Sequence, residues 1–255
     1  MNYELNRSLT VRADGDALTG FRHARLSGRD ALGLCPMPFT LRIWNLAESD
    51  YYRLCAAGKI VVSSEDSVLA AGAVSDVYRH AVPEGTLTEV VFSVGLPLWE
   101  APVSLSVEAG ATVSDTVRRI LDESGIGIPL LSFPGEDPVR SRAQAFYGRA
   151  AECIEEALSA AGARGYLTEA GLCVVPSSGL PVSMELSDAD LLDDPVKVGK
   201  GLLLLRTRIT GWPLGKRISV KWKNESAEGL VLERSVDADN LEGEWWAELL
   251  MKRSG

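Results

Sequence analysis

Apolar and polar side chains alternate with a period of two over residues 39–44, so that large apolar residues fall on one face. This period is typical of a strand with one face on a core. Asn45 ends the strand, and residues 48–50 (Glu, Ser and Asp) supply acceptors and negative charge for the start of a short helix. Gly58 marks its end, and residues 59–63 predict a return strand.

The first part of the chain repeats this strand pattern. Turn signals at residues 14–16 and 83–85 separate successive strands. Roughly six strands and one helix are enough for a small barrel or sandwich. We therefore assign residues 1–101 to an N-terminal β-barrel domain. The predicted strands are residues 3–11, 18–26, 39–44, 59–63, 68–78 and 86–94.

The period changes in the middle of the chain. Apolar residues recur at helical spacing over residues 112–124, with Thr112 placed to cap a helix that Gly125 stops. A second helix is expected over residues 148–161, followed by a hairpin of residues 165–168 and 172–175. These elements predict a small α/β domain of residues 102–181, which ends in a Pro- and Ser-bearing linker.

The remainder returns to strand periodicity, most clearly over residues 216–222. We assign residues 182–255 to a C-terminal β-barrel domain. The predicted fold class is therefore mainly β with a small α/β middle: two small, tube-like β-barrel domains flank a helix-hairpin unit. The strands expected here are residues 182–186, 201–210, 216–224, 230–236 and 244–252.

Several stretches resemble a known family when taken in order. Residues 38–46 and the helix after them are similar to the first-domain strand and short helix of baseplate hub proteins from contractile-tailed phages and related injection systems, the tail hub or late control protein D-like family. Residues 70–77 resemble the family's strand before a long hairpin, and residues 110–121, 147–176 and 211–215 continue the likeness. The resemblance covers nearly the whole chain.

The resemblance implies a structural virion protein and not an enzyme. Hub proteins form a homotrimeric ring whose paired barrels join the tail tube protein to the central spike protein, next to other baseplate proteins. DNA passes through such a ring without specific binding. The resemblance further implies a place in the tail baseplate of the virion, after assembly in the cytoplasm of the bacterial host, and no cofactor.

Composition and charge fit a globular protein without a membrane segment. The 255 residues are 46% hydrophobic and 24% charged, and the longest apolar runs are far shorter than the ~20 residues that span a bilayer. The N-terminus lacks the apolar segment of a secretory signal. A net charge of −9 argues against a surface that grips nucleic acid. Scattered cysteines are interpreted as small buried hydrophobes: Cys35, Cys55, Cys153 and Cys173.

The sequence offers little catalytic or metal-binding chemistry. No nucleophile, zinc-protease or phosphate-loop motif is present, and we predict no catalytic, cofactor-binding or metal residues. His23, between arginines, is expected to be a solvated strand position. The acidic runs at residues 187–194 and 237–242 are interpreted as solvated turn carboxylates. Because 35 acidic residues are present, two carboxylates for glycoside cleavage are also available.

The pair Trp245 and Trp246 is the candidate interface site. Neighbours in a strand point to opposite faces, so we expect one of the two in the core and the other exposed or at a contact. Two functions remain open: a structural hub subunit, and a tail-tip cell-wall hydrolase or carbohydrate-binding β module. The near absence of histidine favours the first. The sequence leaves open whether the parent system is a phage, a bacteriocin or another injection device.

Overall fold

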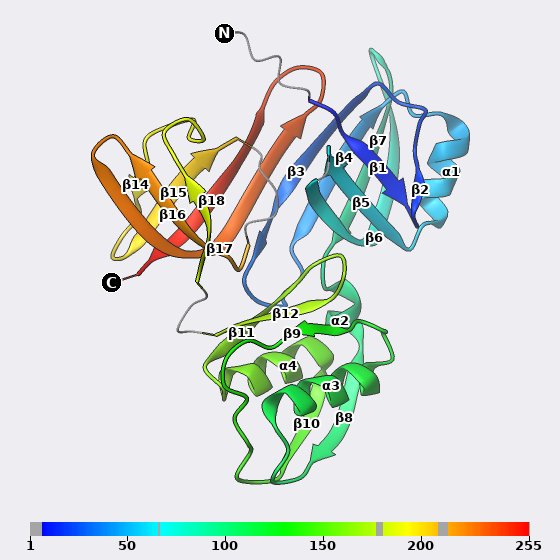
Figure 1. The fold of residues 1–255 in the computed structure, drawn as a ribbon. Helices are drawn as coiled ribbons and strands as arrows, with labels where there is room; N and C mark the ends of the chain where they lie inside the picture. Colours follow the sequence, from blue (N-terminus) through cyan, green and yellow to red (C-terminus); the bar gives the residue numbers. More distant parts are fainter. Residues whose placement is uncertain (1–6, 66, 177–180, 209–213, 255) are drawn as a thin grey trace.

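A computed structural model describes residues 7–65, 67–176, 181–208 and 214–254. Two curled β units lie side by side, and a smaller unit of helices and short strands lies below the first of them (Figure 1). Each of the three regions has its own hydrophobic core. The predicted fold class, mainly β with a small α/β middle, is confirmed.

The first β unit forms where the alternation is strongest. Phe39, Leu41 and Ile43 are fully buried, as the period of two predicts. Asn45 ends this strand in a left-handed conformation (φ 54°), and its side-chain oxygen accepts a hydrogen bond from the Thr86 amide at 3.0 Å. The elements are β1 (Thr10–Ala13), β2 (Asp16–Ala17), β3 (His23–Ala31), β4 (Pro38–Trp44), α1 (Glu48–Ala56), β5 (Lys59–Ser64), β6 (Ser67–Val82) and β7 (Gly85–Ser93).

Three local expectations for this unit are wrong. Of the strand predicted over residues 3–11, residues 3–6 lie outside the described residues and residues 7–9 are not in a strand, because β1 runs over Thr10–Ala13. A single strand over residues 18–26 does not form, because β2 ends at Ala17 and β3 starts only at His23. The acceptors at residues 48–50 do not cap α1, whose N-cap is Ala47 with no side-chain hydrogen bond. Asp50 instead turns away and accepts hydrogen bonds from the amides of Thr19 and Gly20.

The middle unit packs three helices against a two-stranded ribbon and a three-stranded sheet. Thr112 caps the first long helix by accepting from the Asp115 amide, and Gly125 ends it with φ 67°, both as predicted. The ribbon of β8 and β10 was not predicted. The elements are α2 (Leu96–Glu100), β8 (Pro102–Val107), α3 (Val113–Ser124), β9 (Leu130–Ser132), β10 (Gln144–Arg149), α4 (Ala150–Ser159), β11 (Ala163–Leu167) and β12 (Leu172–Pro176).

The last β unit contains the remaining strands around a core that includes Ile218, Val220 and Trp222. Residues 209–213 lie outside the described residues. They include the end of the strand predicted at residues 201–210 and most of the turn at 211–215 that carried part of the resemblance. The strands are β13 (Val182–Leu186), β14 (Val196–Lys197), β15 (Leu202–Thr207), β16 (Arg217–Trp222), β17 (Glu225–Asp239) and β18 (Trp245–Arg253).

One continuous sheet runs through both β units. Its order is β14-β15-β18-β17-β3-β4-β7-β6-β5-β1-β2, with β16 and β13 branching from β17. β17 is long enough to pair with β16 through its first half and with β3 through its second half. Val236 and Ala238 from that second half belong to the core of the first unit. Residues close to the C-terminus in sequence therefore complete the hydrophobic core of the first β unit.

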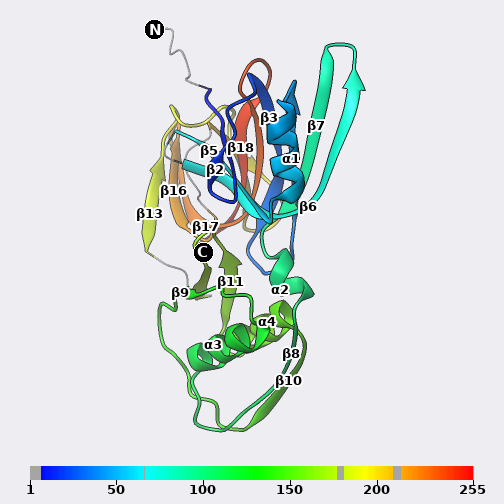
Figure 2. The same ribbon diagram turned by 90° about the vertical axis from the view of Figure 1, so that its right-hand side faces the viewer.

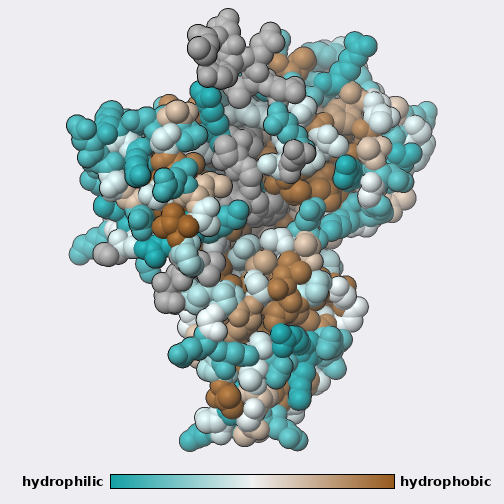
Figure 3. Space-filling view, in the orientation of Figure 1, coloured by the Kyte–Doolittle hydropathy of each residue, from teal (hydrophilic) through white to brown (hydrophobic). Residues whose placement is uncertain are grey.

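The middle unit contacts the first β unit through backbone and side-chain hydrogen bonds. The Gly33 amide donates to the Gly165 carbonyl at 2.8 Å, and the Leu34 amide donates to a Glu155 carboxylate oxygen at 2.6 Å. Apolar residues gather where the two units meet (Figure 3), around a groove of about 320 Å³ whose lining includes Val94, Ile128 and Leu167.

The cysteines follow their prediction only in part. All four are free thiols. Cys153 is buried in the middle core, where burial raises its pKa, and Cys173 is half-buried. Cys35 and Cys55 are exposed, so their interpretation as buried hydrophobes is wrong. In the part of the chain that the structure describes, no helix is long and apolar enough to cross a bilayer.

Candidate functional site

The pairing of β3 with β17 is the feature that makes two β units into one body. The strands run antiparallel from the pair Glu233 and Ala31 to the pair Asp239 and Arg25. These residues lie about 200 positions apart in the sequence, so the pairing is a long-range contact that depends on both units being folded. We call this pair of strands the seam.

A buried ion pair lies within the seam. The Arg234 guanidinium donates to both carboxylate oxygens of Asp30, at 3.1 and 2.9 Å, and to the Leu69 carbonyl at 2.5 Å. Arg234 is only 1% exposed. Burial raises the pKa of Asp30, while the Arg234 guanidinium opposes that shift. Because neither charge reaches water, each requires the other to remain in place.

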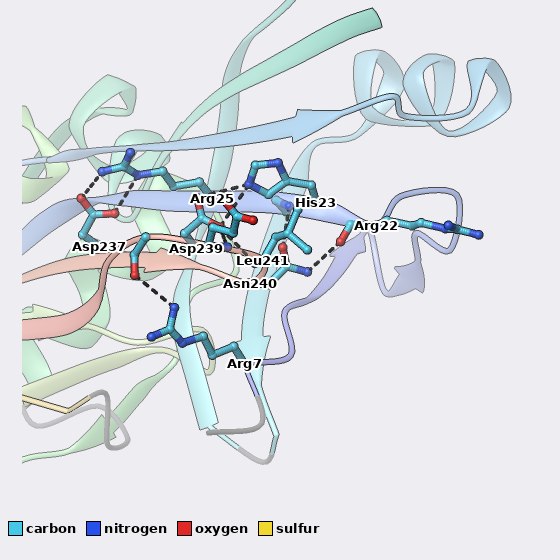
Figure 4. Close-up of polar contacts among 11 residues, drawn as sticks. Arg7, Arg22, His23, Arg25, Asp237, Asp239, Asn240 and Leu241 are labelled. Carbon is cyan, nitrogen blue, oxygen red and sulfur yellow. Dashed lines mark hydrogen bonds and ion pairs between the residues drawn. The ribbon is translucent and has the colours of Figure 1, made fainter. Parts of the chain in front are cut away.

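A second, more accessible pair lies further along the seam. Arg25 binds Asp237 through two parallel hydrogen bonds of 2.8 and 2.6 Å (Figure 4). On the neighbouring strands, Arg42 of β4 binds Glu89 of β7 at 2.8 Å. On this outward face of the sheet, Arg25 and Arg42 are therefore each matched by a carboxylate on an adjacent strand.

The open end of the seam is closed by a cluster around Asp239 (Figure 4). Its carboxylate lies 3.1 Å from Nε2 of His23 and accepts from the amides of Leu241 and Glu242. Burial acts against these bonds, but they lower the pKa of Asp239 overall. Asn240 adds a bond from the Ala24 amide at 2.8 Å. Asp237 and Asp239 therefore hold β17 to β3, and their interpretation as solvated turn carboxylates is wrong. Glu242 and the carboxylates of residues 188, 193 and 194 are exposed, as expected.

His23 is likewise not a simple solvated position. Its ring stacks on Trp44 with centroids 3.9 Å apart, and Asp239 holds one nitrogen. A His–Asp pair can orient an imidazole for proton transfer, but catalysis also needs a nucleophile or substrate group within reach. The ring contacts Asp239 of β17 and Trp44 of β4, and so links β3 to both of its neighbouring strands. Among the residues that the structure describes, no cluster has the composition of a metal site.

Trp245 and Trp246 point to opposite faces, and both are half-buried. Trp245 packs against the first core. Trp246 lies on the other face, opposite Asp237, with the Arg206 guanidinium 4.6 Å from its ring. Its indole N–H is buried without a hydrogen-bond partner among the described residues. A role at an interface stays a prediction for this pair.

Sequence reasoning missed the seam residues Asp30 and Arg234. Both lie on strands with otherwise ordinary alternation, and the only available signal was a charged residue at a position where the pattern requires burial. That signal is weak without knowledge of the partner strand.

No family model matches the chain, and no curated protein matches it. Several solved structures, in contrast, match the chain. The tail protein of Neisseria meningitidis MC58 superposes with a TM-score of 0.72 at 12% identity, over 97% of this chain and 96% of that one. A component of the Escherichia coli type VI secretion system, described as similar to the bacteriophage T4 tail proteins gp27 and gp5, gives 0.71 at 13% identity, over 96% and 77%.

The 43 kDa tail protein of prophage MuSo2 from Shewanella oneidensis gives a TM-score of 0.67 at 12% identity, over 96% of this chain and 97% of that one. The chain has the fold of tail proteins. All three units take part in the likeness, since it spans nearly the whole chain.

Proposed function

We propose that the protein is a structural component of a phage tail or related contractile injection system, and within it a baseplate hub subunit. The observation that carries this proposal is that nearly the whole of this chain shares its fold with two tail proteins and with a type VI secretion component. A likeness confined to one β unit would have carried much less, because small β-barrels serve many functions.

The seam supports a ring of three copies. It joins two β units rigidly within one chain, so three chains would place six such units around one axis. The proposed domains are residues 1–101, 102–181 and 182–255, although α2 at the end of the first packs in the core of the middle unit and the end of β17 reaches from the last domain into the first. The ring would join the tail tube to the central spike in the virion baseplate, contact other baseplate proteins, and leave a passage for DNA.

Native mass spectrometry at rising protein concentration tests the ring, and negative-stain electron microscopy tests its shape. We expect a trimer with a central opening. A chain that stays monomeric at high concentration, both alone and with its tube and spike proteins, would contradict the hub proposal. Turnover of cell-wall glycan by the purified protein would favour the hydrolase instead.

A further inference from the structure

The ribbon of β8 and β10 has an edge without a partner. β8 pairs with β10 and with no other described strand. It lies at the margin of the middle unit, with β10 along one side (Figures 1 and 2). This edge is distant from the seam, and it is present in the single chain whether or not three copies form a ring.

The register identifies the backbone groups on the free edge. The Ala150 amide donates to the Ala101 carbonyl, so residues 101, 103, 105 and 107 face β10 in the antiparallel pattern. The N–H and C=O groups of Ser104 and Ser106 therefore point outward. Pro102, which has no N–H, occupies the remaining outward position, where proline is tolerated.

Apart from Pro102 at its start, the edge lacks the usual protection against strand addition. Natural edge strands carry charges, bulges or a covering element. β8 has no charged residue and a regular register, and its outward side chains are the exposed serines 104 and 106. Leu105 packs against the middle core but stays half-buried. On the same ribbon face as the serines, Tyr147 of β10 is 89% exposed.

The acidic residues on either side of β8 determine which kind of strand its free edge can bind. Exposed Glu100 is the last residue of α2, separated from β8 by Ala101, and exposed Glu108 follows β8 directly. Antiparallel pairing of two copies, centred on Ser104, would bring Glu100 at the end of α2 in one copy near Glu108 of the other. Like charges brought close together repel each other. A second copy is therefore disfavoured, and a strand with a basic residue at each end is favoured.

We propose that the free edge of β8 binds an extended segment of another protein by adding a strand to the ribbon. The segment has an uncharged centre of alternating apolar and small residues, with Lys or Arg at both ends. Its main chain bonds to Ser104 and Ser106, its apolar residues cover Leu105, and its basic ends face Glu100 and Glu108.

A labelled peptide, Lys-Val-Ser-Val-Ser-Val-Lys, tests this on the full-length protein by fluorescence anisotropy. We expect saturable binding, with slowed hydrogen exchange at the Ser104 and Ser106 amides. Ser104→Pro removes an outward N–H without taking a bond from the ribbon, and should weaken binding by about tenfold. Ser104→Ala keeps the N–H and is the matched control, with expected affinity within about twofold of the native protein.

A second pair of reagents tests the charges without touching the backbone. The variant E100K/E108K should prefer the same peptide with Glu at both ends, reversing the order seen for the native protein. The proposal is wrong if the native protein shows no binding at about 1 mM peptide, or if S104P binds as tightly as S104A. It is also wrong if Lys- and Glu-ended peptides bind equally, or if the protein self-associates and S104P abolishes that association.

Discussion

Two strands of this protein, β3 and β8, differ in how their edges are occupied. β3 meets β17 along a seam with a buried ion pair, an accessible ion pair and a closing cluster at Asp239. β8 carries no charge and has a partner on one side only. Charged side chains specify β17 as the partner on this edge of β3, because another strand there would leave Arg234 or Asp30 buried alone. The edge of β8 has no comparable restriction.

The buried pair is expected to give the largest effect when broken. Arg234→Met removes the partner of Asp30 inside the sheet and should lower the free energy of unfolding by about 3–5 kcal/mol. Urea denaturation followed by circular dichroism measures this loss. Arg25→Met is the matched control on the same seam, because Arg25 is partly exposed and should cost about 0–1 kcal/mol.

The double variant R234M/D30L sharpens the comparison. Replacing both buried charges with apolar groups should recover most of the lost stability. Equal, small losses from R234M and R25M would show that the buried pair does not fix the seam.

Local patterns predicted the elements but not the seam. The strand at residues 38–44 and the helix from Val113 to Ser124 were predictable because period, cap and stop signals lie within each segment. The partner of β3 lies about 200 residues away, and no local signal specifies it. Its carboxylates Asp237 and Asp239 resemble turn residues in sequence because their side-chain partners Arg25 and His23 are distant along the chain.

The ribbon was missed for a different reason. Residues 102–107 follow a predicted domain boundary, and residues 148–149 were assigned to the start of a helix. In the structure Gly148 and Arg149 continue β10, and α4 begins only at Ala150. The prediction that the two tryptophans lie on opposite faces agrees with the structure. The sequence could not show that both are half-buried, because Trp246 is covered by Arg206 and Trp245 by the first core.

Trp245 and Trp246 lie on opposite faces of the sheet beside the seam, so replacing each one compares the two faces. The expected loss of stability is smaller than that for the buried ion pair. Trp245→Ala should lower the free energy of unfolding by about 3 kcal/mol, because this ring packs against the first core. Trp246→Ala should cost less in folding and more in assembly, because its ring lies on the opposite face under Arg206.

Denaturation and native mass measurements on both variants separate the two effects. Equal losses of folding from both, with assembly unchanged, would count against an interface role for Trp246.

The smallest expected effect concerns nucleic acid. Phosphate binding requires clustered cations that are free to exchange their counterions. On the outward face near the seam, Arg25 is matched by Asp237 and Arg42 by Glu89, within a chain of net charge −9. We therefore expect no measurable duplex binding at physiological salt in a gel-shift assay, as a passage for DNA requires. The variant D237N/E89Q frees both guanidiniums and should remain a weak binder, because two phosphate contacts supply only a small part of a typical non-specific affinity. Micromolar binding of DNA by the native protein, weakening steeply as salt rises, would contradict this expectation. It would mean that the carboxylates stabilise the seam but do not prevent the nearby arginines from binding phosphate.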